Sequence, residues 1–357
     1  MKHNFYAGPA ILPQQVLEQA ADAARNFDGS GLSILEMSHR SKPIVALMDE
    51  AEQHVRDFLG LNDDYAVLFL TGGASTQFYQ TAANLLPSDG MAGYLDTGAW
   101  STKALKEAKK YGPATEVASS RDKNYSYIPK GYDVPDGLTY FHITSNNTIF
   151  GTQIQEFPTV DAPLVADMSS DIFSRRLPTE RFGMIYAGAQ KNLGPAGVTL
   201  AIVRKDLLGR VNRDLPTMVN YETHIKKASA FNTPPVFPIY VCLLTMRWIK
   251  ENGGLEAMEK RADIKADLLY GEIDRNPLFV GTAAREDRSK MNVCFVPADG
   301  HDDITDDFLR VCAENDLIGV KGHRSVGGFR ASIYNAMEPS SVEHLVQVMQ
   351  EFERTRS

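Results

Sequence analysis

The sequence contains little cysteine and no long apolar run. Its 357 residues include three cysteines, Cys242, Cys294 and Cys312, with no CxxC spacing among them. This pattern disfavours a disulfide framework and predicts reduced, mostly buried thiols. Apolar runs such as YAVLFL at residues 65–70 are far too short to span a bilayer, and the first residues lack the apolar stretch of a signal peptide. We therefore expect a cytoplasmic protein.

An excess of positive charge is also missing. Lys and Arg number 37 against 45 Asp and Glu, which gives a formal net charge of −8 at pH 7. This balance argues against nucleic-acid or membrane partners, so an acidic ligand would need a local cluster of cations. The carboxylates at residues 299–307 lie where a loop enters a helix pattern. Because acidic residues there complement a helix N-terminus, we predict no metal site.

Strand and helix patterns alternate from residue 65 onward, which predicts an α/β fold. Amphipathic helices are expected before it, at residues 14–27 and 44–59. A chain of 357 residues is long enough for two domains. Glycines at 253–254 end another helix pattern, and the composition changes after them. We expect a domain boundary there.

The stretch from residue 183 to 205 presents a lysine between two apolar strand patterns. MIYAG and VTLAIVR enclose a turn rich in glycine, and Lys191 lies in that turn. Small neighbours let another molecule approach closely, which suits a lysine that forms a Schiff base. A lysine at an ordinary hairpin tip is the alternative for this pattern alone.

A carboxylate is expected at the end of another strand. Asp167 ends the apolar run LVAD, and in an open α/β sheet ligands bind at the carboxyl ends of strands. The lysine and the carboxylate together suggest pyridoxal phosphate, because that cofactor needs an amine and a carboxylate that keeps its ring nitrogen protonated. A side chain that caps a following helix is the alternative for Asp167.

Other links between strands and helices hold groups suited to a ligand. TGGASTQF has the form of a glycine turn before a helix, which can bind phosphate, although it lacks the P-loop spacing. Trp100 could stack on a flat heterocycle, and Thr148 could offer a hydroxyl. Asn232 and Thr233 precede two prolines, which predicts an exposed arm suited to an interface. The alternatives are a plain turn for TGGASTQF, a place in the core for the indole of Trp100, and a turn cap for Thr148.

Cationic side chains gather in two segments. His39 and Arg40 lie in an irregular connection, and His323, Arg324 and Arg330 surround a Gly-Gly turn near the C-terminus. Together they could bind a substrate with two anionic ends.

Nine segments, in this order, resemble those of the phosphoserine aminotransferase family, and the resemblance covers essentially the whole chain. These enzymes belong to the class V aminotransferases, which are pyridoxal-phosphate enzymes of fold type I. The resemblance implies a homodimer and a seven-stranded, mostly parallel sheet. It also implies a large domain at residues 14–254 and a small domain formed by residues 1–13 and 255–357. The segments are NFYAGPAILP, MSHRS, TGGASTQF, GAW, SNNTIFGT, ADMSSDIFSR, GAQKNLGPAGV, FNTPPVFPIY and KGHRSVGGFRASIYNA.

The resemblance also implies a role for each candidate. Lys191 resembles the lysine that carries the cofactor, and Asp167 resembles the partner of the ring nitrogen. Some bacterial members have arginine where this chain has Ser75, so the anion contact here must rest more on the remaining cations. The other implied cofactor contacts are Ala74, Ser75 and Gln190 for the phosphate, Trp100 for the ring, Thr148 for the 3-oxygen, and Asn232 and Thr233 from the neighbouring subunit. The implied substrate contacts are Arg330 for the α-carboxylate, with His39, Arg40, His323 and Arg324 near the distal anion.

The implied activity is reversible amino transfer from L-glutamate to 3-phosphohydroxypyruvate in serine biosynthesis, giving O-phospho-L-serine and 2-oxoglutarate. A phosphohydroxythreonine substrate of vitamin B6 synthesis is a further implication. Another class V activity, such as that of a serine–glyoxylate aminotransferase or a cysteine desulfurase, is the alternative among enzymes, although no cysteine lies in a motif-like loop. A non-catalytic phosphate- or nucleotide-binding α/β protein is the alternative outside them.

Overall fold

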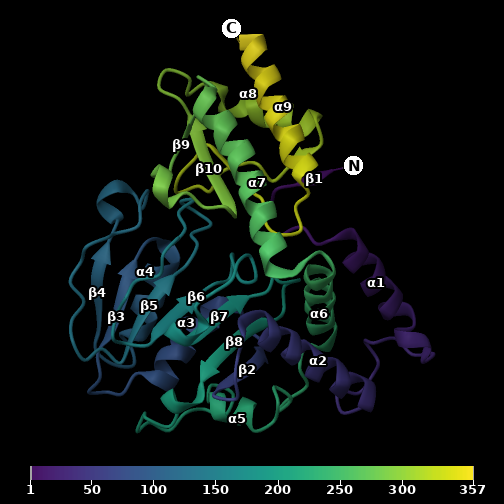
Figure 1. Cartoon of the computed structure of the whole chain (residues 1–357), viewed down its shortest axis with the longest axis vertical. Helices are drawn as coiled ribbons and strands as arrows, with labels where there is room; N and C mark the ends of the chain where they lie inside the picture. Colours follow the sequence, from purple (N-terminus) through teal and green to yellow (C-terminus); the bar gives the residue numbers. More distant parts are fainter. Residues whose placement is uncertain (1, 357) are drawn as a thin grey trace.

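A seven-stranded sheet forms the centre of the lower unit in Figure 1, in a computed structural model that describes residues 2–356. The strand order is β2-β8-β7-β6-β5-β3-β4, and β8 alone runs against its neighbours in this sheet. The mostly parallel sheet expected from the resemblance is therefore confirmed. The strands are β2 (Tyr65–Leu70), β3 (Ala92–Asp96), β4 (Ala114–Ser119), β5 (Tyr140–Thr144), β6 (Leu164–Asp167), β7 (Phe182–Gly188) and β8 (Thr199–Arg204).

Helices cover both faces of this sheet, which explains why its inner strands are apolar throughout. On β7, Met184 and Tyr186 join the core beneath α3 and α4, whereas Ile185 and Ala187 join the core beneath the helices of the opposite face. Helices α3 (Gly73–Leu85) and α4 (Ala99–Ala108) cover one face, and α1 (Gln14–Arg25), α2 (Lys42–Leu59) and α6 (Val236–Glu251) cover the other, with the short α5 (Tyr221–Ile225) beside β2.

The upper unit in Figure 1 is built on a three-stranded antiparallel sheet of order β12-β10-β9. Phenylalanines in tilted and edge-to-face contact fill its core, including Phe279, Phe308 and Phe329. The start of the chain joins this unit, because β1 pairs in parallel with β11. The elements are β1 (His3–Asn4), α7 (Gly254–Arg275), β9 (Phe279–Gly281), β10 (Asn292–Pro297), α8 (Ile304–Glu314), β11 (Leu317–Ile318), β12 (Phe329–Ser332) and α9 (Pro339–Arg356).

Helix α7 contributes to both cores. Leu255 and Met258 pack in the core of the seven-stranded sheet, whereas Ala266 and Leu269 pack in the core of the upper unit. The domain boundary expected after residue 254 stays a prediction. Short 3-10 helices lie in the connections, namely η1 (Phe27–Gly29), η2 (Arg121–Lys123), η3 (Thr179–Arg181), η4 (Lys205–Leu207) and η5 (Arg285–Asp287).

Two elements are shorter than their sequence patterns indicate. The helix pattern of residues 99–112 forms a helix only as far as Ala108, and turns follow to Tyr111. Gly112 then lies so close to the Pro87 carbonyl that a Cβ there would come within 2.8 Å of its oxygen. The strand pattern LIGVK forms only Leu317–Ile318, because Gly319 has a φ of 82° and turns the chain.

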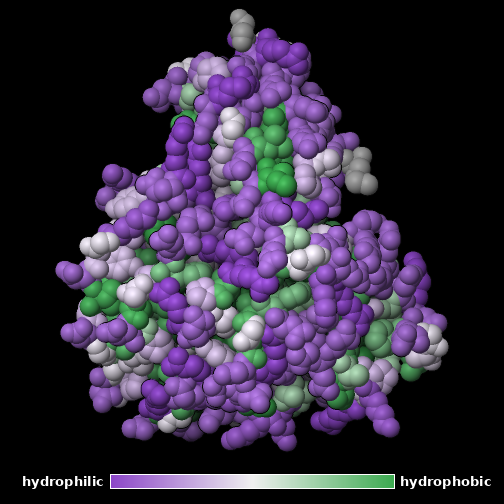
Figure 2. All heavy atoms as spheres, viewed as in Figure 1, coloured by the Kyte–Doolittle hydropathy of each residue, from purple (hydrophilic) through white to green (hydrophobic). Residues whose placement is uncertain are grey.

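The surface shown in Figure 2 is mostly hydrophilic, with an apolar stripe on the upper unit. Within residues 2–356, no helix is both long and apolar enough to cross a membrane. Cys242, Cys294 and Cys312 are buried free thiols, as predicted.

Candidate active site

The candidate residues gather at one edge of the seven-stranded sheet. Strands β2, β3, β5, β6 and β7 run in the same direction, so their carboxyl ends share that edge. The segments that leave this edge begin α3 and α4 and contain Thr148 and Lys191, and Asp167 is the last residue of β6.

Lys191 lies in the turn between β7 and β8, as predicted. Its Nζ is 5.3 Å from the centroid of the Trp100 ring. Gly8 packs against its stem, since a Cβ on Gly8 would be 3.3 Å from Lys191 Cγ. Burial lowers the pKa of Lys191, and Arg330 lowers it further, whereas Asp167 and Asp171 oppose the shift. A lower pKa increases the fraction of neutral, nucleophilic amine.

Asp167 ends β6 with 6% of its surface exposed. Its Oδ1 accepts hydrogen bonds from the backbone N–H of Ser169 at 3.0 Å and from Ser169 Oγ at 2.6 Å. Ser169 Oγ in turn accepts from the N–H of Gly188 at 3.0 Å, which ties the carboxylate to the end of β7. No group within residues 2–356 donates to Oδ2, so that oxygen is available to a ligand. Turns rather than a helix follow Asp167, so it caps no helix.

Trp100, Thr148 and Arg330 come from three different elements and are joined by hydrogen bonds. Trp100 Nε1 donates to Thr148 Oγ1 at 3.2 Å, and Arg330 Nη1 donates to the Thr148 carbonyl at 2.7 Å. The Nε of Arg330 is buried without a partner. The Arg330 guanidinium also has no carboxylate partner in the described part of the chain, so it can bind an anion from outside.

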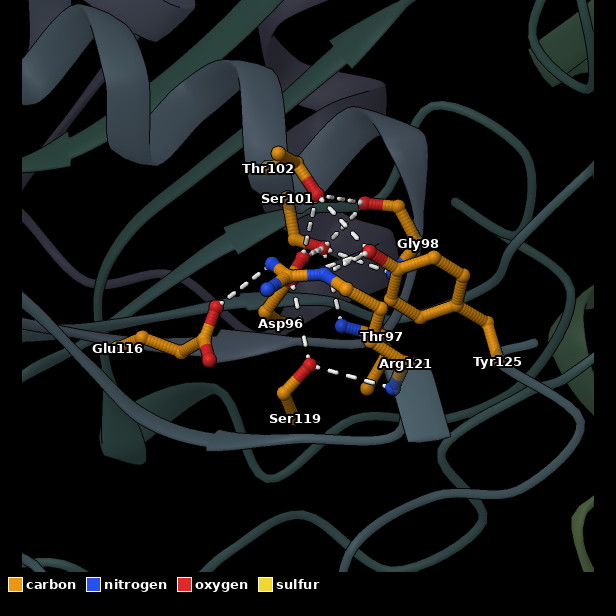
Figure 3. A network of polar contacts seen from close by, with 9 residues as sticks. All are labelled: Asp96, Thr97, Gly98, Ser101, Thr102, Glu116, Ser119, Arg121 and Tyr125. Atoms are coloured by element: carbon orange, nitrogen blue, oxygen red, sulfur yellow. Dashed lines mark hydrogen bonds and ion pairs between the residues drawn. The ribbon is translucent and has the colours of Figure 1, made fainter. Parts of the chain in front are cut away.

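A buried carboxylate, Asp96, receives hydrogen bonds at the start of α4 (Figure 3). Asp96 is 0% exposed, and its Oδ1 accepts from Ser101 Oγ and Thr102 Oγ1, each at 2.8 Å. Its Oδ2 accepts from Arg121 Nη2 at 2.6 Å. Because Ser101 and Thr102 belong to the first turn of α4, Asp96 fixes the start of the helix on which Trp100 lies.

The first turn of α3 has no side-chain cap, so the N–H groups of Ala74 and Ser75 are open to an anion. Gly72 precedes the helix with a φ of 94°, which favours glycine. Asn232 and Thr233 are exposed, as predicted, and with Gly72 they line a cavity of about 240 Å³.

Gln190, which precedes Lys191, is half-buried. Its carbonyl accepts from the N–H of Ala10 at 2.9 Å, and its side-chain amide has no hydrogen-bond partner in the described residues. The first residues of the chain therefore contact the turn that carries the lysine.

The loop between β11 and β12 brings cations to the same region. Burial lowers the pKa of His323, and the charges of Arg330, Arg324 and Lys103 lower it further. Lys103 Nζ also lies 4.6 Å from the centroid of the Trp100 ring. Arg324, Arg330 and Lys103 form no ion pair with any carboxylate in residues 2–356. Lys103 thus neighbours Trp100, and its charge acts on His323 together with those of Arg324 and Arg330.

His39 and Arg40 are not joined to this group. They precede α2, and within residues 2–356 no hydrogen bond or ion pair links them to the turn of Lys191. The Nε2 of His39 is buried without a partner, whereas Arg40 is exposed. Asn232 and Thr233 likewise have no such link to Lys191.

Sequence reasoning missed several residues of the site. Lys103 follows Trp100 by three positions, so helix spacing alone could have placed it on the same face. Asn192 Oδ1 accepts from the N–H of Asn335 at 3.0 Å, and Asn335 Nδ2 donates to the Phe173 carbonyl at 2.8 Å. This contact ties the lysine turn to the segment after β12, and no sequence signal pointed to it.

The side chains fit pyridoxal phosphate. An amine of lowered pKa, a carboxylate with one free oxygen and an indole ring lie together, and an uncapped helix start lies at the same sheet edge. A cavity of about 570 Å³ between residues 128–134 and 154–160 contains none of the candidate residues.

Comparisons with known proteins agree with this arrangement. Residues 2–345 match the family described as Aminotransferase class-V. A phosphoserine aminotransferase of Parabacteroides distasonis is 58% identical over 353 residues, which cover 99% of each chain. The structure of a phosphoserine aminotransferase from Bacillus circulans subsp. alkalophilus aligns with a TM-score of 0.96 at 45% identity, covering 100% of this chain and 99% of that one. The structure of a pyridoxal-phosphate-bound phosphoserine aminotransferase from Trichomonas vaginalis aligns with a TM-score of 0.93 at 39% identity, covering 98% of this chain and 100% of that one.

Proposed function

The chain belongs to the class V aminotransferase family, and we propose on that premise that it is a phosphoserine aminotransferase. It transfers the amino group of L-glutamate reversibly to 3-phosphohydroxypyruvate and forms O-phospho-L-serine and 2-oxoglutarate. One observation carries the assignment to a doubly anionic substrate: the charge of Arg330 acts on both Lys191 and His323, Arg324 also acts on His323, and neither arginine has a carboxylate partner in the described residues.

The enzyme uses pyridoxal phosphate. When bound, this cofactor supplies an electron sink for the negative charge that develops as a proton leaves the substrate Cα. Asp167 Oδ2 is the oxygen that would keep the ring nitrogen protonated, and Trp100 would cover the ring. Thr148 would donate to the 3-oxygen. For the phosphate, the contacts would be Ala74, Ser75 and Gln190, with Asn232 and Thr233 of a second subunit.

Lys191 Nζ would hold the cofactor and would then take the proton that leaves the substrate Cα. Both roles need a neutral amine for part of the time, and burial supplies it by lowering the pKa of Lys191. Asp167 and Asp171 limit that shift, so the amine can also hold the proton that it has removed.

Arg330 binds the α-carboxylate that all the substrates share. Its guanidinium is held through Nη1 on the Thr148 carbonyl, and its buried Nε lacks a partner until an anion arrives. His323 and Arg324 bind the distal group, which is a carboxylate in glutamate and a phosphate in phosphoserine.

We further propose a homodimer with shared active sites. His39 and Arg40 would complete the distal-anion site of the other subunit, which agrees with their lack of contact with their own Lys191. In a two-fold dimer this sharing is reciprocal. The cytoplasmic location expected from the sequence remains a proposal.

The experiment compares two acceptors that differ only in the phosphate. With glutamate as donor, we expect kcat/KM for 3-phosphohydroxypyruvate to exceed that for hydroxypyruvate by about thirtyfold to several-thousandfold, because an unpaired charge contact costs about 2–5 kcal/mol. Lys191→Ala should fold normally, measured by circular dichroism, and lose nearly all turnover. Equal kcat/KM for the two acceptors, or a faster reaction with glyoxylate, would assign the chain to another class V activity.

A further inference from the structure

We propose that Lys103 is a further contact for the distal phosphate and adds to the preference for phosphorylated acceptors; this inference rests on the proposed function.

The position of Lys103 directs its amine toward the site. It lies in α4 three residues after Trp100, and helical side chains lean toward the helix N-terminus, over the preceding turn. Its Nζ is accordingly 4.6 Å from the centroid of the Trp100 ring. Lys191 Nζ is 5.3 Å from the same centroid. One indole therefore has the amine of the reaction and the amine of Lys103 as neighbours.

The surroundings of Lys103 are cationic. Its charge acts on His323 in the loop between β11 and β12, as do the charges of Arg324 in the same loop and of Arg330 in β12. No carboxylate within residues 2–356 pairs with Lys103, Arg324 or Arg330. Like charges that converge without counter-ions repel one another, so a bound anion relieves the repulsion. A phosphate carries more negative charge than a carboxylate and gains more from an additional cation.

The same helix offers a matched control. Lys106 is exposed like Lys103 and lies almost one turn farther along α4. It has no ring contact or ion pair in the described part of the chain, and it is not among the charges that shift the pKa of His323. Both substitutions replace a lysine of the same helix and remove the same charge, so they differ mainly in the position of that charge relative to Trp100 and His323.

The kinetic test uses the holoenzyme with Lys103→Gln and Lys106→Gln. For Lys103→Gln we expect kcat/KM for 3-phosphohydroxypyruvate to fall about three- to tenfold, as for loss of a partly exposed charge contact, and to fall less for hydroxypyruvate. Inorganic phosphate should inhibit this variant more weakly by a similar factor. Lys106→Gln should leave both acceptors as in the wild type. Equal losses for the two acceptors, or equal effects of the two substitutions, would overturn the assignment.

A second readout does not depend on turnover. Because Lys103 lowers the pKa of His323, Lys103→Gln should raise that pKa, which NMR titration of the imidazole measures once the signal has been assigned with His323→Gln. Lys106→Gln should not change it. An unchanged pKa in Lys103→Gln would place Lys103 away from the anion site. If the wild type itself shows no preference for the phosphorylated acceptor, the proposed function fails; if the preference exists but Lys103→Gln retains it, only the role of Lys103 fails.

Discussion

Lys265, in α7, is a lysine buried away from solvent. It is 0% exposed, and its Nζ donates to the carbonyl oxygens of Tyr334 at 2.5 Å and Met337 at 3.1 Å. These carbonyls flank Asn335, whose backbone N–H donates to Asn192 beside Lys191. Burial, with a smaller contribution from Arg261, lowers the pKa of Lys265 from 10.5 to about 7.

This lysine makes stability depend on pH. Between about pH 7 and 10.5 the amine is neutral in the folded state and protonated in the unfolded state, so unfolding takes up a proton. The free energy of unfolding therefore rises with pH in that window, by up to about 1.4 kcal/mol per unit for this group. Between pH 7 and 9, we expect the free energy of unfolding of the wild type to rise by about 2–3 kcal/mol relative to that of Lys265→Met, measured by urea unfolding.

Lys260→Met is the control, because Lys260 is an exposed lysine of the same helix. The difference in free energy of unfolding between Lys260→Met and the wild type should stay constant with pH. A constant difference for Lys265→Met as well would mean that Lys265 keeps its proton when buried.

Sequence patterns predicted the positions of individual site residues correctly where those residues follow or end a strand. Lys191 and Asp167 lie at strand ends, as predicted, because a short apolar run followed by glycine or a polar residue indicates both the strand and its edge. Lys103 and Asn335 were missed because their role depends on which loop of another unit meets them. The spacing of residues along one helix indicates which side chains share a face of that helix, but it does not indicate which other segment packs against that face.

At the scale of elements, the start of α4 depends on Asp96. The carboxylate receives hydrogen bonds from two hydroxyls of the first helical turn and from Arg121. Arg121 also pairs with Glu116 at 2.9 Å, but the side chain of Glu116 is 34% exposed and that of Asp96 is 0% exposed. The two carboxylates share one cation and differ in burial.

We expect Asp96→Asn to lower the free energy of unfolding by about 2–4 kcal/mol, because a buried charge partner is removed and an amide donor faces other donors. It should also loosen the turn of Trp100, which indole fluorescence reports, and weaken cofactor binding. Glu116→Gln should cost less than about 1 kcal/mol, as exposed pairs do. Similar losses in free energy of unfolding for the two variants would show that Asp96 stabilises the protein through its ion pair with Arg121 and not through the start of α4.

Most elements could be predicted from periodicity, and their ends less well. The inner strands are apolar at every position because both faces are covered, which the runs YAVLFL and LVAD already indicated. Two features were not predicted: the end of α4, before Gly112 packs against Pro87, and the short β11, where the backbone of Gly319 turns the chain. Those depend on neighbours from other parts of the chain.

At the scale of the whole molecule, the proposed shared site can be tested with mixed dimers. Lys191→Ala and Arg40→Ala chains, each nearly inactive alone, are co-expressed with different tags. If Arg40 serves the other subunit, one site of each mixed dimer receives both substitutions and the other receives neither. With random pairing, about a quarter of wild-type activity should return, and about half in purified mixed dimers.

The two intact active sites expected in each wild-type dimer set the scale for that measurement. Mass spectrometry verifies the mixed species before the assay. A verified mixed dimer without activity would mean that Arg40 serves its own chain, and it would leave the chemistry of Lys191 untouched.

The pairing of β1 with β11 has a consequence for the order in which the protein is made. His3 pairs with Leu317, and Phe5 belongs to the same core as Phe329. A ribosome releases the first strand long before its partner exists, and at roughly 5–20 residues per second the delay is on the order of a minute or less. Through that interval Phe5 has no core of its own to enter. The upper unit therefore cannot close during translation until the last third of the chain has emerged, even if the seven-stranded sheet has already formed.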